Sequence, residues 1–347
     1  MLSLVALTVL VIPAAEPADW KAAESPFLRN IRALTTSDVF ARAGEGYFAP
    51  DGKSILFQGE EKGVDNPFYQ IFHLDLASGK FRRVSPGVGR TTCSYFRPDG
   101  KKIIFASSHL DPEAKKRYAE ERAVRAEEAK SRRPRRYVWD FDPYYDIWEA
   151  NLDGSGLRRL TTAKGYDAEG SYSPDGKQIV FCSNRSGEKN LELYIMDADG
   201  GNVRQLTHAP GCYNGGPFFS PDGKRVIFRA DRKKPHHLQL YVIDVDGKNE
   251  RALTDDLSWV QWAPYWHPDN RHIIYTAADH SKPGRPNYDL YWMDVDTGKK
   301  VRLTFAPGAD VLPVFSPDGK KVMWSSTRDG KQPGAQLYIA DFTPPKE

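Results

Sequence analysis

The chain has 347 residues, of which 40% are hydrophobic, 12% are aromatic and 27% are charged, and its formal net charge at pH 7 is +3. This length is ample for a large hydrophobic core, and the composition is typical of a globular protein. The nearly balanced charge gives no strong electrostatic steering toward nucleic acid or acidic surfaces, so we expect no nucleic-acid partner.

The chain begins with a short apolar segment at residues 2–12, which several alanines follow. This length suits the hydrophobic region of a signal peptide and is too short to cross a bilayer. No Lys or Arg precedes the segment, which departs from the usual pattern of such signals. We interpret residues 1–18 as a signal peptide and 19–29 as a short N-terminal segment. We therefore expect a periplasmic or secreted protein with no membrane span.

A ten-residue phrase recurs along the rest of the chain, in forms such as YSPDGKQIVF and FSPDGKRVIF. Aligned on the Pro-Asp pair, its six copies place their aspartates at Asp51, Asp99, Asp175, Asp222, Asp269 and Asp318. Five copies follow a common period, and the second copy is longer by about 29 residues. The sequence therefore predicts a repeat protein with one insertion.

Each copy contains four short apolar runs separated by turn residues, which predicts four strands joined by hairpins. The Pro-Asp-Gly phrase favours a tight turn, because Pro presets φ, Asp bonds to nearby amides and Gly accepts positive φ. Four-stranded units of roughly 47 residues are typical of propeller blades. Aromatic residues on both sides of the turn in every copy favour packing between blades. We predict an all-β fold, a six-bladed β-propeller of four-stranded antiparallel blades, over residues 30–342.

The two ends of the propeller complete one another. The sixth copy ends without a fourth strand and is followed only by a tail at 343–347, whereas residues 31–36 read IRALTT, a fourth-strand phrase without a blade of its own. We infer that this N-terminal strand completes the last blade and closes the ring. Because a closed ring leaves no free sheet edge for pairing, we expect a monomer.

The insertion follows the second strand of the second copy, at 110–136. Asp111 and Pro112 form a helix-start signal, and the helix formers that follow predict a charged helix of roughly four to five turns. Residues 111–136 carry 10 Lys and Arg against 6 Asp and Glu. Two interpretations stay open, a solvated helix packed on the rim and a basic lid or docking arm. Strand alternation places the insertion on the face from which the innermost strands begin.

The phrases SPDGK, LYIMDADGGN and RQLT resemble the PD40 (WD40-like) repeats of TolB-type six-bladed propellers, over roughly residues 30–342. TolB proteins are periplasmic partners of a peptidoglycan-associated lipoprotein in an envelope complex. The resemblance therefore implies a protein or peptide partner in the cell envelope. TolB carries an α/β domain before its propeller, and we expect that domain to be absent here, with only residues 19–29 in its place.

Propeller ligands are usually found at the mouth of the channel, so positions just before the innermost strands are candidates. One set of equivalent residues is Ala43, Thr91, Asp167, Asn214, Gln261 and Asp310. The set two residues later, on the same face if strand alternation is regular, is Glu45, Cys93, Glu169, Gly216, Ala263 and Leu312. Both sets vary between copies, as a site without six-fold symmetry requires, although a wet channel lined by short polar side chains is the alternative.

Acidic residues would dominate this mouth, and Arg90, Arg185 and Arg328 could offset them. A basic peptide would fit such a mouth, and so would a sugar held by aromatic residues. We predict that ligand binding involves Glu45, Arg90, Asp167, Glu169, Tyr213, Asn214, Gln261, Trp262 and Asp310.

Several enzyme and metal-binding classes lack support in the sequence. It contains no GxSxG, HExxH or CxxC motif, and its DxDG phrases lack the remaining ligands of a calcium loop. Its three cysteines, Cys93, Cys182 and Cys212, form no evident disulfide framework. We therefore predict no catalytic residue, no metal site and no cofactor.

Two functions are compatible with these features. We favour a non-catalytic, exported scaffold that binds a protein or peptide through its channel mouth and helical insertion. The alternative is a carbohydrate-active propeller enzyme, a glycan lyase or hydrolase, whose paired carboxylates would act at the same mouth.

Overall fold

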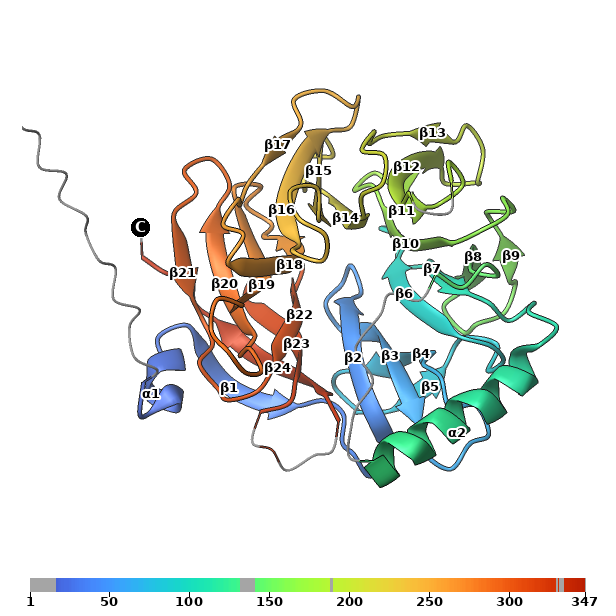
Figure 1. Cartoon of the computed structure of the whole chain (residues 1–347), viewed down its shortest axis with the longest axis horizontal. Coiled ribbons are helices and arrows are strands. Elements are labelled where there is room, and N and C mark those ends of the chain that lie inside the picture. Colours follow the sequence, from blue (N-terminus) through green and yellow to red (C-terminus); the bar gives the residue numbers. More distant parts are fainter. Residues whose placement is uncertain (1–16, 132–140, 188–189, 329, 331–333, 347) are drawn as a thin grey trace, which may run out of the picture.

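The computed structural model describes residues 17–131, 141–187, 190–328, 330 and 334–346. Six four-stranded antiparallel sheets stand around a central channel, with one edge strand of each sheet facing the axis (Figure 1). The predicted six-bladed β-propeller is confirmed.

The first three blades follow chain order, from the innermost to the outermost strand. Blade 1 contains β2 (Phe40–Phe48), β3 (Ser54–Glu61), β4 (Gln70–Asp75) and β5 (Phe81–Arg83). Blade 2 contains β6 (Thr91–Phe96), β7 (Lys102–Ser107), β8 (Asp146–Asn151) and β9 (Arg158–Arg159). Blade 3 contains β10 (Asp167–Tyr172), β11 (Gln178–Ser183), β12 (Glu192–Asp197) and β13 (Arg204–Gln205).

The next two blades have the same order, and the last one recruits the N-terminal strand. Blade 4 contains β14 (Asn214–Phe219), β15 (Arg225–Ala230), β16 (Gln239–Asp244) and β17 (Arg251–Ala252). Blade 5 contains β18 (Trp259–Trp266), β19 (His272–Asp279), β20 (Asp289–Asp294) and β21 (Lys300–Arg302). Blade 6 contains β22 (Asp310–Phe315), β23 (Lys321–Ser326), β24 (Gln336–Phe342) and β1 (Leu28–Ala33).

The ring is closed by its N-terminal strand, as predicted. β1 pairs antiparallel with β24, with Leu28 opposite Phe342 and Ala33 opposite Tyr338. The strand begins before the predicted segment 31–36, and its pairing contains an irregularity between Arg29 and Arg32. This pairing gives the sixth blade its fourth strand and joins distant parts of the chain.

The hydrophobic core lies between neighbouring blades. The aromatic residue of each second strand is almost fully buried, and the six are Phe57, Phe105, Phe181, Phe228, Tyr275 and Trp324. Clusters cross from blade to blade, as where Ile227 of β15 packs with Trp266 of β18. Each large side chain buried in this way stabilises the fold by about 1.5–3 kcal/mol.

Two helices accompany the strands, α1 (Trp20–Glu24) and α2 (Ala114–Ser131). The second helix is the predicted insertion, of which residues 132–136 lie outside the described part. The segment that contains α2 is inserted between two strands of blade 2, yet α2 packs on blade 1 (Figure 1). Arg122 Nη1 donates to Asp65 Oδ1 at 2.7 Å, and the Tyr118 and Phe68 rings meet with centroids 5.8 Å apart. The insertion therefore joins two blades at the rim.

Residues 1–16, which hold most of the predicted signal peptide, also lie outside the description. Among the residues that are described, the helices are too short or too polar to cross a membrane.

Candidate functional site

The same irregularity interrupts all six innermost strands. In each blade the pairing of the first strand with the second contains a β-bulge, where the register shifts by one residue, as between Ala168 and Ser171 of β10. The residue at the bulge has a positive φ in every blade, from 46° at Glu45 to 58° at Gly216. We call these residues the bulge ring: Glu45, Cys93, Glu169, Gly216, Ala263 and Leu312.

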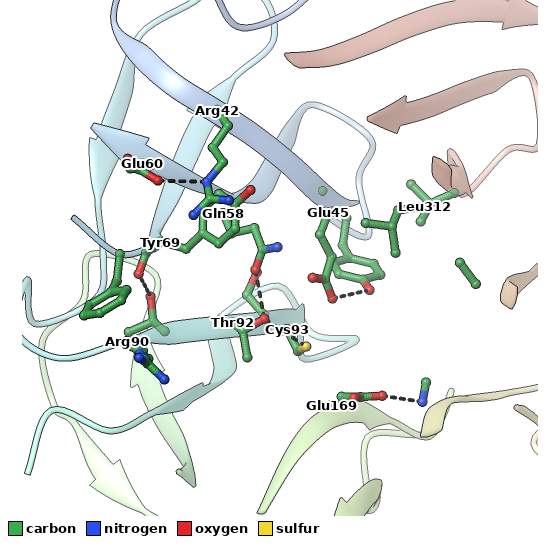
Figure 2. Close-up of a pocket in the computed structure, with 18 of the residues that line it drawn as sticks. Arg42, Glu45, Gln58, Glu60, Tyr69, Arg90, Thr92, Cys93, Glu169 and Leu312 are labelled. Carbon is green, nitrogen blue, oxygen red and sulfur yellow. Dashed lines mark hydrogen bonds and ion pairs between the residues drawn. The ribbon is translucent and has the colours of Figure 1, made fainter. Parts of the chain in front are cut away.

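A bulge redirects the side chain that it carries. All six residues of the bulge ring line one cavity of about 1250 Å³ in the central channel. Figure 2 shows Glu45, Cys93 and Glu169 reaching this space from blades 1, 2 and 3, with Leu312 on another side. L-residues reach such a conformation at a cost of about 1–2 kcal/mol each, so its repetition indicates that the fold imposes it.

Aromatic rings close one end of the cavity. Tyr47 of blade 1 meets Phe218 of the opposite blade 4, with ring centroids 5.7 Å apart. The Tyr95 and Tyr265 hydroxyls are 3.2 Å apart. We call these four rings the aromatic plug. Because rings from opposite blades touch, the channel is blocked at this level.

The insertion helix borders the cavity at its mouth. Arg125 of α2 lines the cavity, donates through Nη1 to Glu60 Oε1 at 2.5 Å and donates through Nη2 to the Pro67 carbonyl at 2.9 Å. The other Glu60 oxygen accepts from Arg42 Nε at 2.8 Å. Glu60 thus links the helix to blade 1, and α2 is both packed on the rim and part of the mouth.

Glu169, the bulge residue of blade 3, is a buried carboxylate with many partners. Arg229 Nη2 donates to its Oε2 at 3.2 Å, and the backbone N–H of Gly216 donates to the same oxygen. The hydroxyls of Tyr166 and Tyr213 lie 3.3 and 3.4 Å from Oε1. Side chains of both charged partners are less than one-tenth exposed, so the pair forms a compensated unit inside the protein.

Glu45, the bulge residue of blade 1, is held differently. Its carboxylate accepts from the Tyr47 hydroxyl at 3.3 Å, and no ion pair joins it to a Lys or Arg of the described chain. Burial raises the pKa of Glu45 from 4.5 to about 7; the Cys93 thiol opposes this rise and the charge of Glu169 adds to it. Near neutral pH this side chain can therefore gain or lose a proton.

The cavity wall is divided into two halves. Blades 1 to 3 contribute most of the polar groups, among them Glu45, Gln58, Thr92, Cys93 and Glu169, together with several tyrosines. Blades 5 and 6 contribute mostly apolar groups, namely Trp262, Ala263, Pro264, Leu312, Pro313 and Val314. A ligand with one polar and one apolar side would match this wall.

Four of the predicted site residues line this cavity: Glu45, Arg90, Glu169 and Trp262. Tyr213 stands behind the wall, where its hydroxyl contacts Glu169 and Arg229. The structure does not bring the other four to the wall: Asp167, Asn214, Gln261 and Asp310.

Two of those four form buried ion pairs beside the channel. Arg185 Nη2 lies 3.0 Å from both oxygens of Asp167. Arg328 pairs with Asp310 at 2.8 Å and also with Glu24 of α1 at 3.1 Å. Two of the three arginines that were expected to offset an acidic mouth, Arg185 and Arg328, therefore neutralise these aspartates inside the structure, whereas Arg90 lines the cavity.

The two amides of that set also have internal partners. Asn214 Nδ2 donates to the Leu191 carbonyl at 2.9 Å, and Gln261 Nε2 donates to Gln239 Oε1 at 3.2 Å. The assumption that residues two apart share one face is wrong at these positions. At these four positions only the residue two places later, at the bulge, lines the cavity, whereas in blade 2 both Thr91 and Cys93 line it.

Sequence reasoning missed Arg229, the cation of the Glu169 cluster. Arg229 directly follows the buried aromatic residue of β15. The residues at the same position in the other five blades are uncharged: Gln58, Ala106, Cys182, Thr276 and Ser325. An arginine inside such an apolar run was the available signal, because a buried cation needs a partner.

The described residues contain no cluster of three His, Cys, Asp or Glu side chains that could hold a metal ion. The half-buried thiol of Cys93 lines the cavity, and desolvation raises its pKa well above the usual range.

Comparison with known proteins supports the repeat assignment. The family model described as the PD40 TolB beta propeller domain matches residues 140–284. An uncharacterized protein of Agrobacterium fabrum is 30% identical over 165 residues, which are 46% of this chain and 44% of that protein. The Tol-Pal system protein TolB of Bordetella pertussis is 42% identical over 50 residues, 14% of this chain and 11% of that one. The matches thus span less than half of these relatives.

Solved structures show the same architecture at low identity. A putative TolB from Agrobacterium tumefaciens has a TM-score of 0.62 and 20% identity, with 90% of this chain and 94% of that chain covered. An oligogalacturonate lyase from Vibrio parahaemolyticus has a TM-score of 0.56 and 15% identity, covering 90% and 93%. TolB from Acinetobacter baumannii has a TM-score of 0.55 and 21% identity, covering 88% and 64%. Residues 140–284 are therefore similar to the PD40 TolB beta propeller family, and the six-bladed propeller fold of the chain resembles the fold of these solved structures.

Proposed function

We propose that this protein is a non-catalytic scaffold that captures a segment of a protein or peptide partner in its channel cavity, with α2 at the mouth. The observation that carries the proposal is the plugged cavity of about 1250 Å³, because it can enclose several residues of an extended segment. Its polar and apolar halves suit a peptide, which carries backbone hydrogen-bonding groups and side chains of both kinds.

The proposal includes a location in the periplasm or outside the cell. The apolar segment at residues 2–12 and the similarity to a protein named for the Tol-Pal system support it. A partner in the cell envelope would suit both features.

The alternative is a glycan lyase or hydrolase acting in the same cavity. Two observations favour it, the likeness of fold to an oligogalacturonate lyase and the presence of two cavity glutamates, one with a pKa of about 7. A group with that pKa can serve as a general acid or base. Against it, Glu169 is already occupied by Arg229 and two tyrosine hydroxyls.

Selection of peptides from a random phage-displayed library, followed by binding measurements with synthetic copies, tests the proposal. Leu312→Trp would fill the cavity from the bulge ring, and Val203→Trp would add the same group on an outer loop that is exposed. We expect the selected peptides to lose at least about tenfold in affinity for the first variant. Their affinity for the second variant should be unchanged.

Equal affinity for the two variants would place binding outside the cavity and contradict the proposal. A parallel assay would incubate the protein with oligogalacturonate and follow ultraviolet absorbance of an unsaturated product. Turnover that Leu312→Trp abolishes would establish the alternative instead.

A further inference from the structure

The bulge ring contains two glutamates, Glu45 and Glu169, whose charged neighbours differ. At Glu169, the neighbouring blade 4 supplies a cation, Arg229, which pairs across the blade junction at 3.2 Å. Arg229 lies opposite Gly215 in the ladder of its own blade. Its guanidinium is also 5.7 Å from the Tyr213 ring and 5.8 Å from the Trp262 ring. The protein thus shows how a cation is received in this channel, by a carboxylate and aromatic faces together.

At Glu45 the neighbouring blade 2 supplies no such group. Ala106 lies opposite Thr92 in the ladder of that blade, which is the position that Arg229 occupies in blade 4. Ala106 is buried and carries no charge. Glu45 therefore has no arginine at the position from which Arg229 pairs with Glu169.

The groups that face Glu45 come from several blades, and most are neutral. Tyr47 donates its hydroxyl, and Ser325 Oγ of blade 6 accepts the backbone N–H of Glu45 at 3.0 Å. Cys93 of blade 2 is protonated at neutral pH because burial raises its pKa. The charges of Glu169 and Arg229 act on Glu45 while pairing with each other. Arg42, Arg90 and Arg125 line the same cavity and pair with Glu60 or Asp142.

Aromatic rings stand around the same space. Tyr69, Tyr145 and Tyr166 all line the cavity. The Tyr69 ring carries the Arg42 guanidinium over its face, 4.8 Å from the ring centroid, so this part of the wall already accommodates one cation. A carboxylate with nearby ring faces is the chemistry that recognises ammonium and guanidinium groups.

We propose that Glu45 receives a cationic group of the ligand, a lysine or arginine side chain or a free amino terminus, in the polar half of the cavity. This inference rests on the proposed function, because it takes the cavity as the binding site. The ligand would supply the charge that Arg229 supplies for Glu169. The apolar part of the ligand would lie along Trp262 and Leu312.

Cation binding at Glu45 requires the ionised carboxylate, so it should depend on pH. With a pKa of about 7 in the free protein, Glu45 is mostly protonated at pH 6 and mostly ionised at pH 8. Affinity for a cationic ligand should therefore fall by about tenfold between pH 8 and pH 6.

Four pools of hexapeptides with blocked termini provide the test. The third residue is Lys, Arg, norleucine or Glu in the four pools, and the other positions contain only uncharged residues. Retention on the immobilised full chain would be measured at pH 8 and pH 6. We expect the Lys and Arg pools to be retained at least about fivefold more than the norleucine pool at pH 8, with the preference reduced at pH 6.

Two variants and one control connect this preference to Glu45. Glu45→Gln should abolish the preference, and so should Ala106→Arg, which would place an internal cation beside Glu45. Glu113→Gln is the control, since it makes the same chemical change at an exposed residue that pairs with Lys116. It should retain the full preference.

Equal retention of the Lys and norleucine pools overturns this inference and leaves channel binding of another peptide class standing. A preference that survives Glu45→Gln also overturns it. If no pool is retained, the cationic anchor is wrong, and phage selection in the previous experiment decides separately whether the cavity binds peptides at all.

Discussion

Glu45 of blade 1 and Glu169 of blade 3 are the same residue at the same position of the repeat, yet they differ in electrostatic state. Both lie at a bulge with positive φ and both line the channel. Glu169 is neutralised by Arg229 of the next blade, whereas blade 2 offers Glu45 only Ala106 at the corresponding place. The comparison teaches that the repeat determines where a side chain points, while the adjacent blade determines its charge.

Removing Arg229, the cation that pairs with Glu169, should give the largest loss of stability. Arg229→Ala would leave Glu169 buried without its partner, which costs about 3–5 kcal/mol of unfolding free energy. Urea unfolding at pH 7.5 would measure this loss. The double variant Arg229→Ala with Glu169→Gln should recover part of it, because no charge is then left unpaired. A single variant as stable as the wild type would contradict the compensated pair.

Crowding the same pair should give a smaller effect. A Cβ added at Gly216 would clash with Nη1 of Arg229, and the position has a φ of +58°. Gly216→Ala should therefore cost about 2–3 kcal/mol through strain and a displaced guanidinium. Thermal unfolding measures the change.

Ala263→Gly is the matched control, since Ala263 has the same conformation on the apolar side of the ring, with a φ of +49°. Relief of strain and loss of backbone restriction roughly cancel there, so stability should change by less than about 0.5 kcal/mol. Equal losses in both variants would mean that the bulge itself, and not the ion pair, is sensitive.

Glu45, which has no cationic partner, should have the smallest effect on stability, and this effect should depend on pH. Folded Glu45 keeps its proton up to about pH 7, whereas a glutamate with the ordinary pKa of 4.5 releases it earlier. The folded state binds more protons between these values, so stability falls as pH rises through this window.

Glu45→Gln removes that loss. The variant should match the wild type near pH 4 and exceed it by about 1–2 kcal/mol at pH 8, a figure reduced from the full shift because the cavity admits solvent. Chemical unfolding at several pH values measures the difference. Parallel curves for the two proteins would show that Glu45 has no shifted pKa.

Prediction from the sequence succeeded where a local pattern repeats. The Pro-Asp-Gly turns and the aromatic positions predicted six blades, and the unpaired phrase at 31–36 predicted the closing strand. The insertion helix was also predicted, and Asp111 accepts from the backbone N–H of Glu113 at 2.9 Å beside its start. These features depend on residues close in the chain, or on one edge that needs a partner.

The candidate site was predicted only in part. Glu45 and Glu169 reach the cavity as expected, whereas Asp167 and Asp310 turn to Arg185 and Arg328. The choice depends on a bulge, which regular strand alternation does not include. Arg229 was missed because its partner belongs to another blade, 60 residues away in the chain.

By itself, the sequence determined the number of blades, their aromatic packing and the closure of the ring, because these follow from short-range turn chemistry and a repeated apolar pattern. Only the tertiary structure decided which residues of the innermost strands enter the channel, that α2 rests on blade 1, and which of two equivalent glutamates keeps an unmatched charge. The first outcome depends on a bulge in the strand pairing within each blade, and the other two depend on contacts between neighbouring blades, which form only when the chain folds into the ring.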